Sequence, residues 1–280
     1  MIHNNFIEIQ GHRGARGLFP ENTLTSFLEA IKIGVKVIEL DVVISKDQKI
    51  VVSHEPFMNP IFCSTPDGSF VNSQSEKEFN LFQMDYYEIA KFDCGSRGNY
   101  LFPNQIKIKE HKPLLADVVK LIETYTIENN LPAVTYNVEI KSLPEGDDIF
   151  HPKPELFVKL VCKEINSLNI SGRFILQSFD VRILKELKKT NPNFPISYLV
   201  ENTNSLTENL QLLGFTPDIY APEFILITES MITELKKKQI RLITWTVNEI
   251  EDMKRLISMG VTTLITDYPD RAINLIKQTL

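Results

Sequence analysis

The chain has 280 residues, 43% hydrophobic and 24% charged. This is an ordinary globular composition, and the chain is long enough to form a hydrophobic core that is stable without disulfide bonds or structural metal ions. Its net charge of −6 argues against a nucleic-acid-binding surface, which normally carries a basic patch. No segment reaches the ~18 apolar residues of a membrane helix, and no signal peptide is visible. We therefore expect a cytoplasmic protein without stable membrane insertion; a periplasmic or secreted location would need a leader ahead of this sequence.

Short β-rich runs alternate with amphipathic segments along most of the chain. In chain order, the predicted strands are FIEIQG, VKVIELDVVI with KIVVSH as its extension, AVTYNVEIK, FILQSF, PISYLV, DIYAP, RLITWTVN and TTLITD. The predicted helices are 22–34, 115–129, 154–168, 180–190, 204–213, 229–239, 249–260 and 269–279. Apolar runs of this length between helices are typical of βα units around a parallel sheet. Eight such units predict one (β/α)8 TIM-barrel domain over residues 1–280.

A doubly wound open sheet is the alternative architecture. That fold requires a G-x-G-x-x-G turn after its first strand, and the GHRGARG segment does not match it. The sequence therefore favours the barrel.

One connection is far longer than the others. Between Glu55 and about Lys112 the sequence is rich in proline, glycine, serine and aromatic residues, with only a helical patch near 84–92. Ordinary βα loops have ~2–6 residues, so a stretch of this length is usually a functional lid or a small inserted subdomain. We predict a cap inserted after the second strand, at about 55–112.

The cysteines give no sign of a disulfide framework. Cys63, Cys94 and Cys162 lie far apart, their number is odd, and no C-x-x-C spacing indicates zinc or redox chemistry. The sequence therefore predicts three unpaired thiols in a reducing compartment.

Two carboxylates interrupt the apolar run VIELDVV. Glu39 and Asp41 are two residues apart, so they share one face of the strand and are expected to point into the barrel. Ile38, Leu40 and Val42 occupy the other face and are expected to pack on the helices. Like charges held this close are unfavourable unless a proton or a cation compensates them.

The same pattern recurs in YNVEIK, where Asn137, Glu139 and Lys141 share a face. Three carboxylates without a cysteine or paired-histidine motif suit a hard cation. Glu39, Asp41 and Glu139 are therefore predicted to bind one divalent cation, Mg2+ or Ca2+.

Two histidines stand at the ends of predicted strands, His12 after the first strand and His54 after KIVVSH. Both are expected at the rim where barrel enzymes carry their chemistry, and two histidines can serve as base and acid in one displacement. Arg13 offers a planar fork suited to phosphate oxygens. The remaining histidines have no such neighbours and are predicted to be surface or loop residues: His3, His111 and His151.

The segment that follows His12 is expected to be a tight loop. Gly11, Gly14 and Gly17 allow close backbone approach and positive φ. Asn22 or Thr23 is predicted to cap the helix that follows, and the Asn22 amide is also placed to brace the metal or histidine site.

Taken together, these segments resemble a known family. GHRGARGLFPENTLTSF, IELDVVISKDQKIVVSHE, NVEIK, WTVN and ITDYP are similar, in order and across nearly the whole chain, to the glycerophosphodiester phosphodiesterase family. The segment KFDCGSRGNYLFPNQ and the insertion after His54 also resemble that family, the insertion matching its small cap domain. One departure is Glu55, where the family more often has aspartate.

The resemblance implies a TIM barrel that hydrolyses glycerophosphodiesters to sn-glycerol 3-phosphate and an alcohol, using a divalent cation, in glycerol and lipid metabolism. By position, His12 and His54 match the base and acid pair. The implied metal ligands are Glu39, Asp41 and Glu139, and the implied substrate contacts are Arg13, Lys141 and Trp245. Gln177 in LQSF is a weaker candidate at the rim. The sequence leaves open which histidine is the base, whether water or the glycerol hydroxyl attacks, and the oligomeric state.

Two other functions are considered. A lysophospholipase D-like or phosphoinositide-type phosphodiesterase would have an apolar mouth, for which Phe57, Met58, Ile61 and Phe62 are the only hint, and these are expected to form the core of the cap instead. A silent barrel that only binds phosphorylated ligands would lack a histidine or a metal carboxylate, whereas all five are present.

Overall fold

The computed structural model describes residues 7–279 and confirms the predicted barrel. Its parallel strands form a nearly closed sheet in the order β8-β7-β6-β5-β4-β2-β1-β9. Single bridges from Glu223 to Trp245 and from Thr244 to Leu264 continue the ring beyond β8. The barrel strands are β1 (Glu8–Gly11), β2 (Val37–Ile44), β4 (Thr135–Ile140), β5 (Phe174–Ser178), β6 (Ile196–Val200), β7 (Ile219–Pro222), β8 (Arg241–Leu242) and β9 (Thr263–Thr266).

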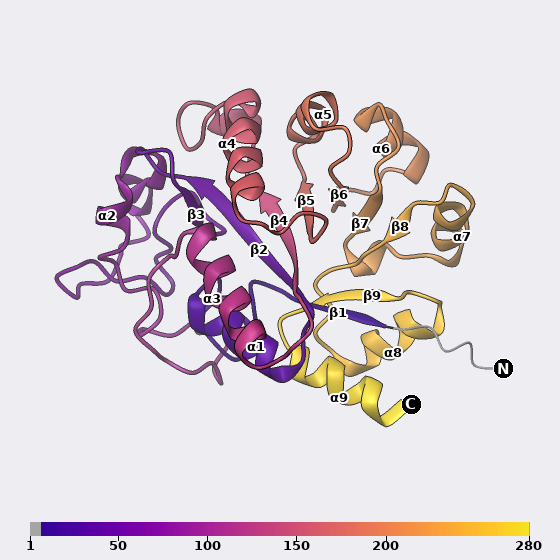
Figure 1. Cartoon of the computed structure of the whole chain (residues 1–280), viewed down its shortest axis with the longest axis horizontal. Coiled ribbons are helices and arrows are strands. Elements are labelled where there is room, and N and C mark those ends of the chain that lie inside the picture. Colours follow the sequence, from indigo (N-terminus) through magenta and orange to yellow (C-terminus); the bar gives the residue numbers. More distant parts are fainter. Residues whose placement is uncertain (1–6, 280) are drawn as a thin grey trace.

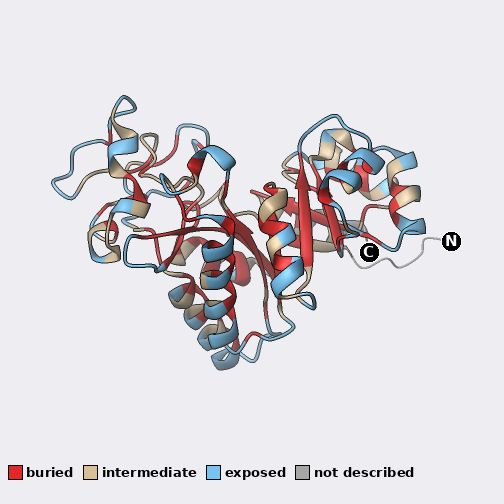
Figure 2. Ribbon diagram, turned by 90° about the horizontal axis from the view of Figure 1, so that it is seen from above, coloured by how far each residue is buried: buried red, intermediate tan, exposed pale blue. Residues whose placement is uncertain are grey.

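Helices cover the outside of this sheet (Figure 1). They are α1 (Leu24–Ile33), α3 (Leu115–Glu128), α4 (Pro154–Ser167), α5 (Val181–Thr190), α6 (Leu206–Leu213), α7 (Glu229–Lys237), α8 (Ile250–Ser258) and α9 (Pro269–Thr279). In Figure 2 most strand residues are buried and the outer faces of the helices are exposed, the exception being β8, which is exposed or half-buried. Along residues 7–279, no helix combines the length and the apolar character needed to cross a membrane.

The segment KIVVSH is not an extension of β2, as the sequence analysis expected. It forms β3 (Ile50–Val52), which pairs antiparallel with β2 and lies off the barrel path. The chain reverses between Ser45 and Lys49, where Gln48 has a φ of 60°. Because of this reversal, Ser53 donates a backbone hydrogen bond to Asp41 at 3.0 Å, and His54 is brought back to the end of β2 that carries Asp41.

The two faces of β2 separate as the alternation predicted. Ile38, Leu40 and Val42 belong to the apolar core between sheet and helices. Glu39 and Asp41 are also buried, but on the inner face, where Glu39 contacts Gln177 of β5. The inside of the barrel thus carries polar groups at the mouth end.

The inserted segment, residues 55–112, holds α2 (Tyr86–Ile89) and lies on the side of the molecule away from both chain ends (Figure 1). It has its own small core, which includes Met58 and Phe62 and is continuous with Val43 and Val51. Ile61 packs against that core, whereas Phe57 lines a cavity described below.

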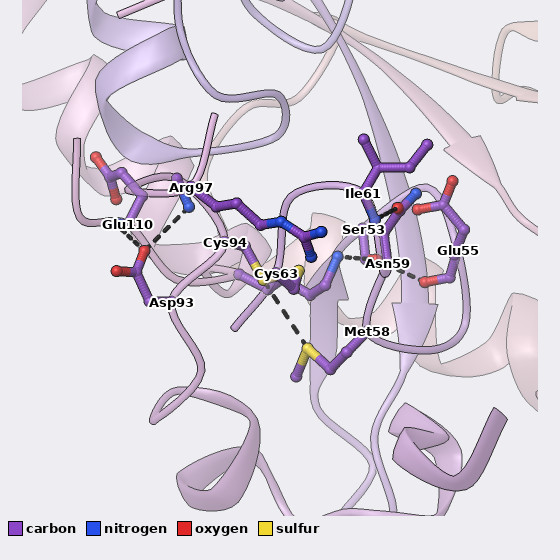
Figure 3. The surroundings of a disulfide bond; sticks show 12 residues. Ser53, Glu55, Met58, Asn59, Ile61, Cys63, Asp93, Cys94, Arg97 and Glu110 are labelled. Atoms are coloured by element: carbon purple, nitrogen blue, oxygen red, sulfur yellow. Dashed lines mark hydrogen bonds between the residues drawn. A yellow bond between two sulfur atoms is a disulfide. The ribbon is translucent and has the colours of Figure 1, made fainter. Parts of the chain in front are cut away.

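The prediction of three unpaired thiols was wrong for two of them. Cys63 and Cys94 form a disulfide inside the cap, next to Met58 (Figure 3), whereas Cys162 is free and buried. Ser64 and Asp93 are antiparallel bridge partners, so the preceding and following residues, Cys63 and Cys94, face each other at the position where paired strands approach most closely. Sequence separation alone did not reveal this pairing.

Candidate active site

The loop between β1 and α1 holds His12 and Arg13 in a fixed conformation. Arg13 has a φ of 49° and Gly14 a φ of 89°, and a side chain on Gly14 would lie 2.4 Å from Ser26 Oγ. Thr23 caps α1 by accepting a hydrogen bond from the Ser26 amide, which settles the choice of cap. Asn22 takes the other predicted role, because its side-chain amide donates to Asp41 Oδ2 at 2.9 Å.

The three predicted carboxylates meet at the mouth end of the barrel. Asp41 and Glu139 are register partners on β2 and β4, and Glu39 lies one step deeper on the same face. All three are buried, and ligand oxygens from each lie within 4.8 Å of one another. This cluster is the arrangement that the sequence analysis predicted for a divalent cation.

Two cations flank the cluster without balancing it. Arg13 Nε lies 3.2 Å from Asp41 Oδ2, and Lys141 Nζ lies 2.6 Å from Glu139 Oε1. Arg13 Nη1 is also bonded to Glu21 Oε1 at 2.7 Å, which brings a fourth carboxylate. The three clustered carboxylates therefore face two cations, and Arg13 is shared with Glu21, which also lies 3.8 Å from Arg16 Nη1.

The pKa values of Glu39 and Asp41 shift in opposite directions, because the two carboxylates are buried beside different charges. Burial, Asp41 and Glu139 raise the pKa of Glu39 well above its usual range. Burial alone would raise the pKa of Asp41, but Arg13, His54 and Lys141 hold it far below normal. Within residues 7–279, Asp41 Oδ1 is buried and has no hydrogen-bond partner. A buried carboxylate oxygen without a hydrogen bond, 3.9 Å from Lys141 Nζ and beside a carboxylate that favours its proton, fits a site for a hard divalent cation.

His12 is held from the far end of the chain. Its Nδ1 lies 2.7 Å from Asp267 Oδ1, just after β9. Arg16 Nε, at 2.9 Å, and Asn248 Nδ2, at 2.8 Å, also contact the Asp267 carboxylate. Burial would raise the pKa of Asp267, but His12 and Arg16 hold it well below normal, so the carboxylate is an acceptor. Nδ1 of His12 therefore carries the proton, and Nε2, 4.0 Å from Glu39, keeps its lone pair.

His54 is held by its own neighbour. Its Nδ1 lies 2.9 Å from Glu55 Oε1, and although burial would raise the pKa of Glu55, the hydrogen bond to His54 lowers it to about 2. Lys112 Nζ donates to Ser53 Oγ at 2.8 Å, and burial lowers the pKa of Lys112. His54 thus sits at the junction of barrel and cap.

Both histidines line one cavity of about 660 Å³. Glu39, Glu139 and Lys141 reach it from the barrel, as do Arg13 and Gln177. Its apolar wall includes Pro56, Phe57, Phe150, Phe179, Leu199 and Trp245, together with Leu143 and Ile265. The ring of Trp245 meets Phe179 edge to face at 5.4 Å, and its Nε1 donates to the Ala221 carbonyl. Every predicted site residue except Asp41 lines the cavity, and Asp41 belongs to the adjoining carboxylate cluster.

Sequence reasoning missed two residues of the site. Asp267 and Glu21 contact His12 and Arg13, and Asp267 ends a predicted strand, which is the signal that had selected the histidines. His151 lies in a loop, as expected, but it is buried there and lines the cavity, and its Nε2 accepts a hydrogen bond from the Leu143 amide. His111 is half-buried in a loop, as expected, and His3 lies outside the described residues.

Comparison with known proteins agrees with this geometry. Residues 12–271 match the model of the glycerophosphoryl diester phosphodiesterase family. The chain is 32% identical to a glycerophosphodiester phosphodiesterase of Caldanaerobacter subterraneus subsp. tengcongensis, over 95% of this chain and 96% of that protein.

Two solved structures have the same fold. A putative glycerophosphoryl diester phosphodiesterase from Silicibacter pomeroyi superposes with a TM-score of 0.87 and 29% identity, over 99% of this chain and 96% of that one. An Oleispira antarctica phosphodiesterase, solved with the product sn-glycerol-3-phosphate, has a TM-score of 0.76 and 20% identity, over 97% of both chains.

Proposed function

Because the chain belongs to the glycerophosphoryl diester phosphodiesterase family and is an enzyme of that class, we propose that it cleaves glycerophosphodiesters by metal-dependent histidine acid–base catalysis. The observation that carries this proposal is the meeting of three buried carboxylates and two carboxylate-bound histidines around one cavity. The Oleispira enzyme binds sn-glycerol 3-phosphate, which is the phosphorylated product expected here.

Glu39, Asp41 and Glu139 would hold the cation, Mg2+ or Ca2+. A divalent cation in that position would neutralise charge on the phosphodiester, which as an anion otherwise repels a nucleophile. Arg13 and Lys141 add fixed positive charge beside the same carboxylates and are assigned to the phosphoryl oxygens. Trp245 and Phe179 supply the apolar surface against which the carbon atoms of the glycerol would pack.

We assign the base to His12 and the acid to His54. Burial lowers the pKa of His12 to about 4, so its imidazole is neutral at pH 7 and can accept a proton on Nε2. His54 is the more exposed of the two, on the side where a departing alcohol would leave. His12 removes the proton from the attacking oxygen as that oxygen bonds to phosphorus, the bond from phosphorus to the alcohol oxygen breaks, and His54 protonates the departing oxygen.

An acyl-bearing diester, such as a lysophospholipid, is the second candidate substrate. One observation favours it: the rings of Phe57, from the cap, and Phe150, from the loop after β4, meet at 6.3 Å in the cavity wall, next to exposed Leu143. A single acyl chain could lie along this apolar side.

The proposal is tested by identifying the products. Glycerophosphocholine, glycerophosphoethanolamine and lysophosphatidylcholine are supplied separately with Mg2+, with Ca2+ and with EDTA, and phosphorus NMR follows each reaction. We expect metal-dependent formation of glycerol 3-phosphate and free alcohol, and a transient cyclic phosphate would identify the glycerol hydroxyl as the attacking group. Phosphocholine as the product would contradict the proposed bond cleavage, and faster turnover of lysophosphatidylcholine would favour the second candidate.

A further inference from the structure

One loop of the cap buries two amide side chains and exposes most of its large apolar side chains. Within residues 96–109, the docking loop, Asn99 and Gln105 are buried. Tyr100 is 75% exposed, Leu101 58%, Ile106 54% and Ile108 40%, whereas Phe102 is buried. Single exposed apolar residues are common, but a short loop that exposes four large apolar side chains marks an interaction site.

The docking loop is fastened in this state by contacts with the loop after β1. Gln105 Nε2 donates to the backbone carbonyls of Arg16, at 2.7 Å, and Phe19, at 2.9 Å. The Ile106 amide donates to the Leu18 carbonyl at 2.8 Å, and the guanidinium of Arg16 lies 4.7 Å from the ring of Phe102. Because these contacts use the inward-facing residues, the exposed apolar side chains cannot turn inward without breaking them.

The charge of the docking loop is opposite to that of the whole chain. Residues 96–109 contain Arg97, Lys107 and Lys109 and no acidic residue, in a chain of net charge −6. The carboxylates on either side of the loop already accept hydrogen bonds from the protein. Asp93 accepts them from the Gly95 and Ser96 amides, and Glu110 accepts them from Thr25. Figure 3 shows Arg97, Asp93 and Glu110 around the disulfide that fixes this part of the cap.

A second hollow, of about 420 Å³, adjoins the docking loop. It is lined by Lys91, Arg97 and Lys109, with the hydroxyl side chains of Ser64, Thr65 and Ser96, and Asp93 is its only carboxylate among the described residues. The guanidinium of Arg97 is held 4.0 Å from the ring of Phe70. Three cations and three hydroxyl groups around a shallow hollow suit the phosphate of a lipid headgroup.

We propose that the docking loop binds the surface of an anionic lipid bilayer. Tyr100, Leu101 and Ile106 would enter the interfacial region, while the adjacent hollow and Lys107 would contact anionic headgroups. An exposed tyrosine beside aliphatic residues and lysines suits this interface, because tyrosine is enriched where apolar and polar regions of a bilayer meet and lysines are attracted to anionic headgroups. The contact is peripheral and brings a cavity that accepts diesters to a membrane surface.

The test is cosedimentation of the full chain with vesicles. One set mixes phosphatidylglycerol with phosphatidylcholine, and the other is phosphatidylcholine alone. We expect binding to the anionic vesicles that weakens as salt is raised. The variant Tyr100→Ser/Leu101→Ser should bind at least about tenfold more weakly, and Lys107→Gln/Lys109→Gln about fivefold more weakly per lysine. The matched control is Ile127→Ser on α3, where the isoleucine is also 75% exposed but lies outside the cap.

Each variant should keep wild-type turnover of a water-soluble diester, which shows that it is folded. The proposal is overturned if the wild type does not sediment with anionic vesicles, or if Ile127→Ser weakens binding as much as the docking-loop variant. Light scattering supplies the remaining outcome: a dimer of the wild type that Tyr100→Ser/Leu101→Ser dissociates would assign the patch to a second copy of the chain instead.

Discussion

The two histidines of the cavity are held in different ways. His12 is 12% exposed, and its carboxylate partner comes from a strand at the other end of the chain, with Arg16 and Asn248 fixing that partner in turn. His54 is 32% exposed, and its carboxylate partner is the next residue, where the cap begins. His12 is thus held by more contacts and is less exposed than His54, which suits a base that stays in place and an acid that must release an alcohol.

The largest effect is expected at the carboxylates of the barrel side. Asp41→Asn should weaken Mg2+ binding and lower metal-dependent turnover by at least about 10³-fold, because the cation supplies several kcal/mol of charge stabilisation. Calorimetry with Mg2+ measures the first quantity, and glycerol 3-phosphate release the second. The control is Glu145→Gln, an exposed carboxylate at the cavity rim, which should behave as the wild type. Unchanged Mg2+ affinity in Asp41→Asn would place the metal elsewhere.

The two histidine variants should lose similar amounts of activity but differ in how much of it added imidazole restores. His12→Ala and His54→Ala should each lower turnover by about 10²–10⁴-fold, which is the usual contribution of one acid or base. Added imidazole should restore part of the activity of His54→Ala, because that position opens to solvent, and little of that of His12→Ala. Equal rescue of both variants would remove the distinction between a less exposed and a more exposed histidine.

A smaller difference is expected between the carboxylates that hold the histidines. Asp267→Asn should lower kcat by about 10²-fold with little change in KM, because the amide no longer requires the His12 proton on Nδ1. Glu55→Gln should lower kcat by less than about fivefold, since His54 has solvent as an alternative partner. Nitrogen NMR of the His12 ring reports its tautomer directly. A larger loss in Glu55→Gln would mean that His54, and not His12, depends more on its carboxylate partner.

The smallest effect concerns the proton on His12 in the metal-free protein. Burial lowers its folded-state pKa from 6.5 to about 4, against the opposing influence of Asp267. Between these values the unfolded chain binds a proton that the folded chain does not, so the stability of the metal-free protein should fall as pH falls from 6.5 towards 4. NMR titration of the His12 ring should give a midpoint near 4. A midpoint at 6.5 or above would mean that burial does not govern this group.

The features that could be predicted from the sequence are those written in local patterns. Alternation within VIELDVV placed Glu39 and Asp41 on the inner face, and parallel strands with the same pattern brought Glu139 beside them. The prediction that His54 follows a β-strand was confirmed. The direction of that strand was wrong, because β3 runs antiparallel to β2 where an extension of β2 was expected.

The remaining features depend on contacts between distant parts of the chain. Asp267 meets His12 only because β9 closes the barrel beside β1. Cys63 and Cys94 pair because two irregular cap segments form one antiparallel bridge, which has no signature in cysteine spacing. The burial of Gln105 likewise depends on its hydrogen bonds to the carbonyls of Arg16 and Phe19, which hydropathy along the sequence does not show.

The most direct test of the central claim is glycerol 3-phosphate release from glycerophosphocholine by EDTA-treated protein, before and after Mg2+ is returned, with Asp41→Asn and His12→Ala measured alongside. The account predicts that the wild type releases no glycerol 3-phosphate in EDTA and regains its activity when Mg2+ is returned, whereas neither variant regains activity. Equal turnover in EDTA and in Mg2+, or recovery of His12→Ala to the wild-type rate, would contradict catalysis by a histidine beside a metal held by the three carboxylates.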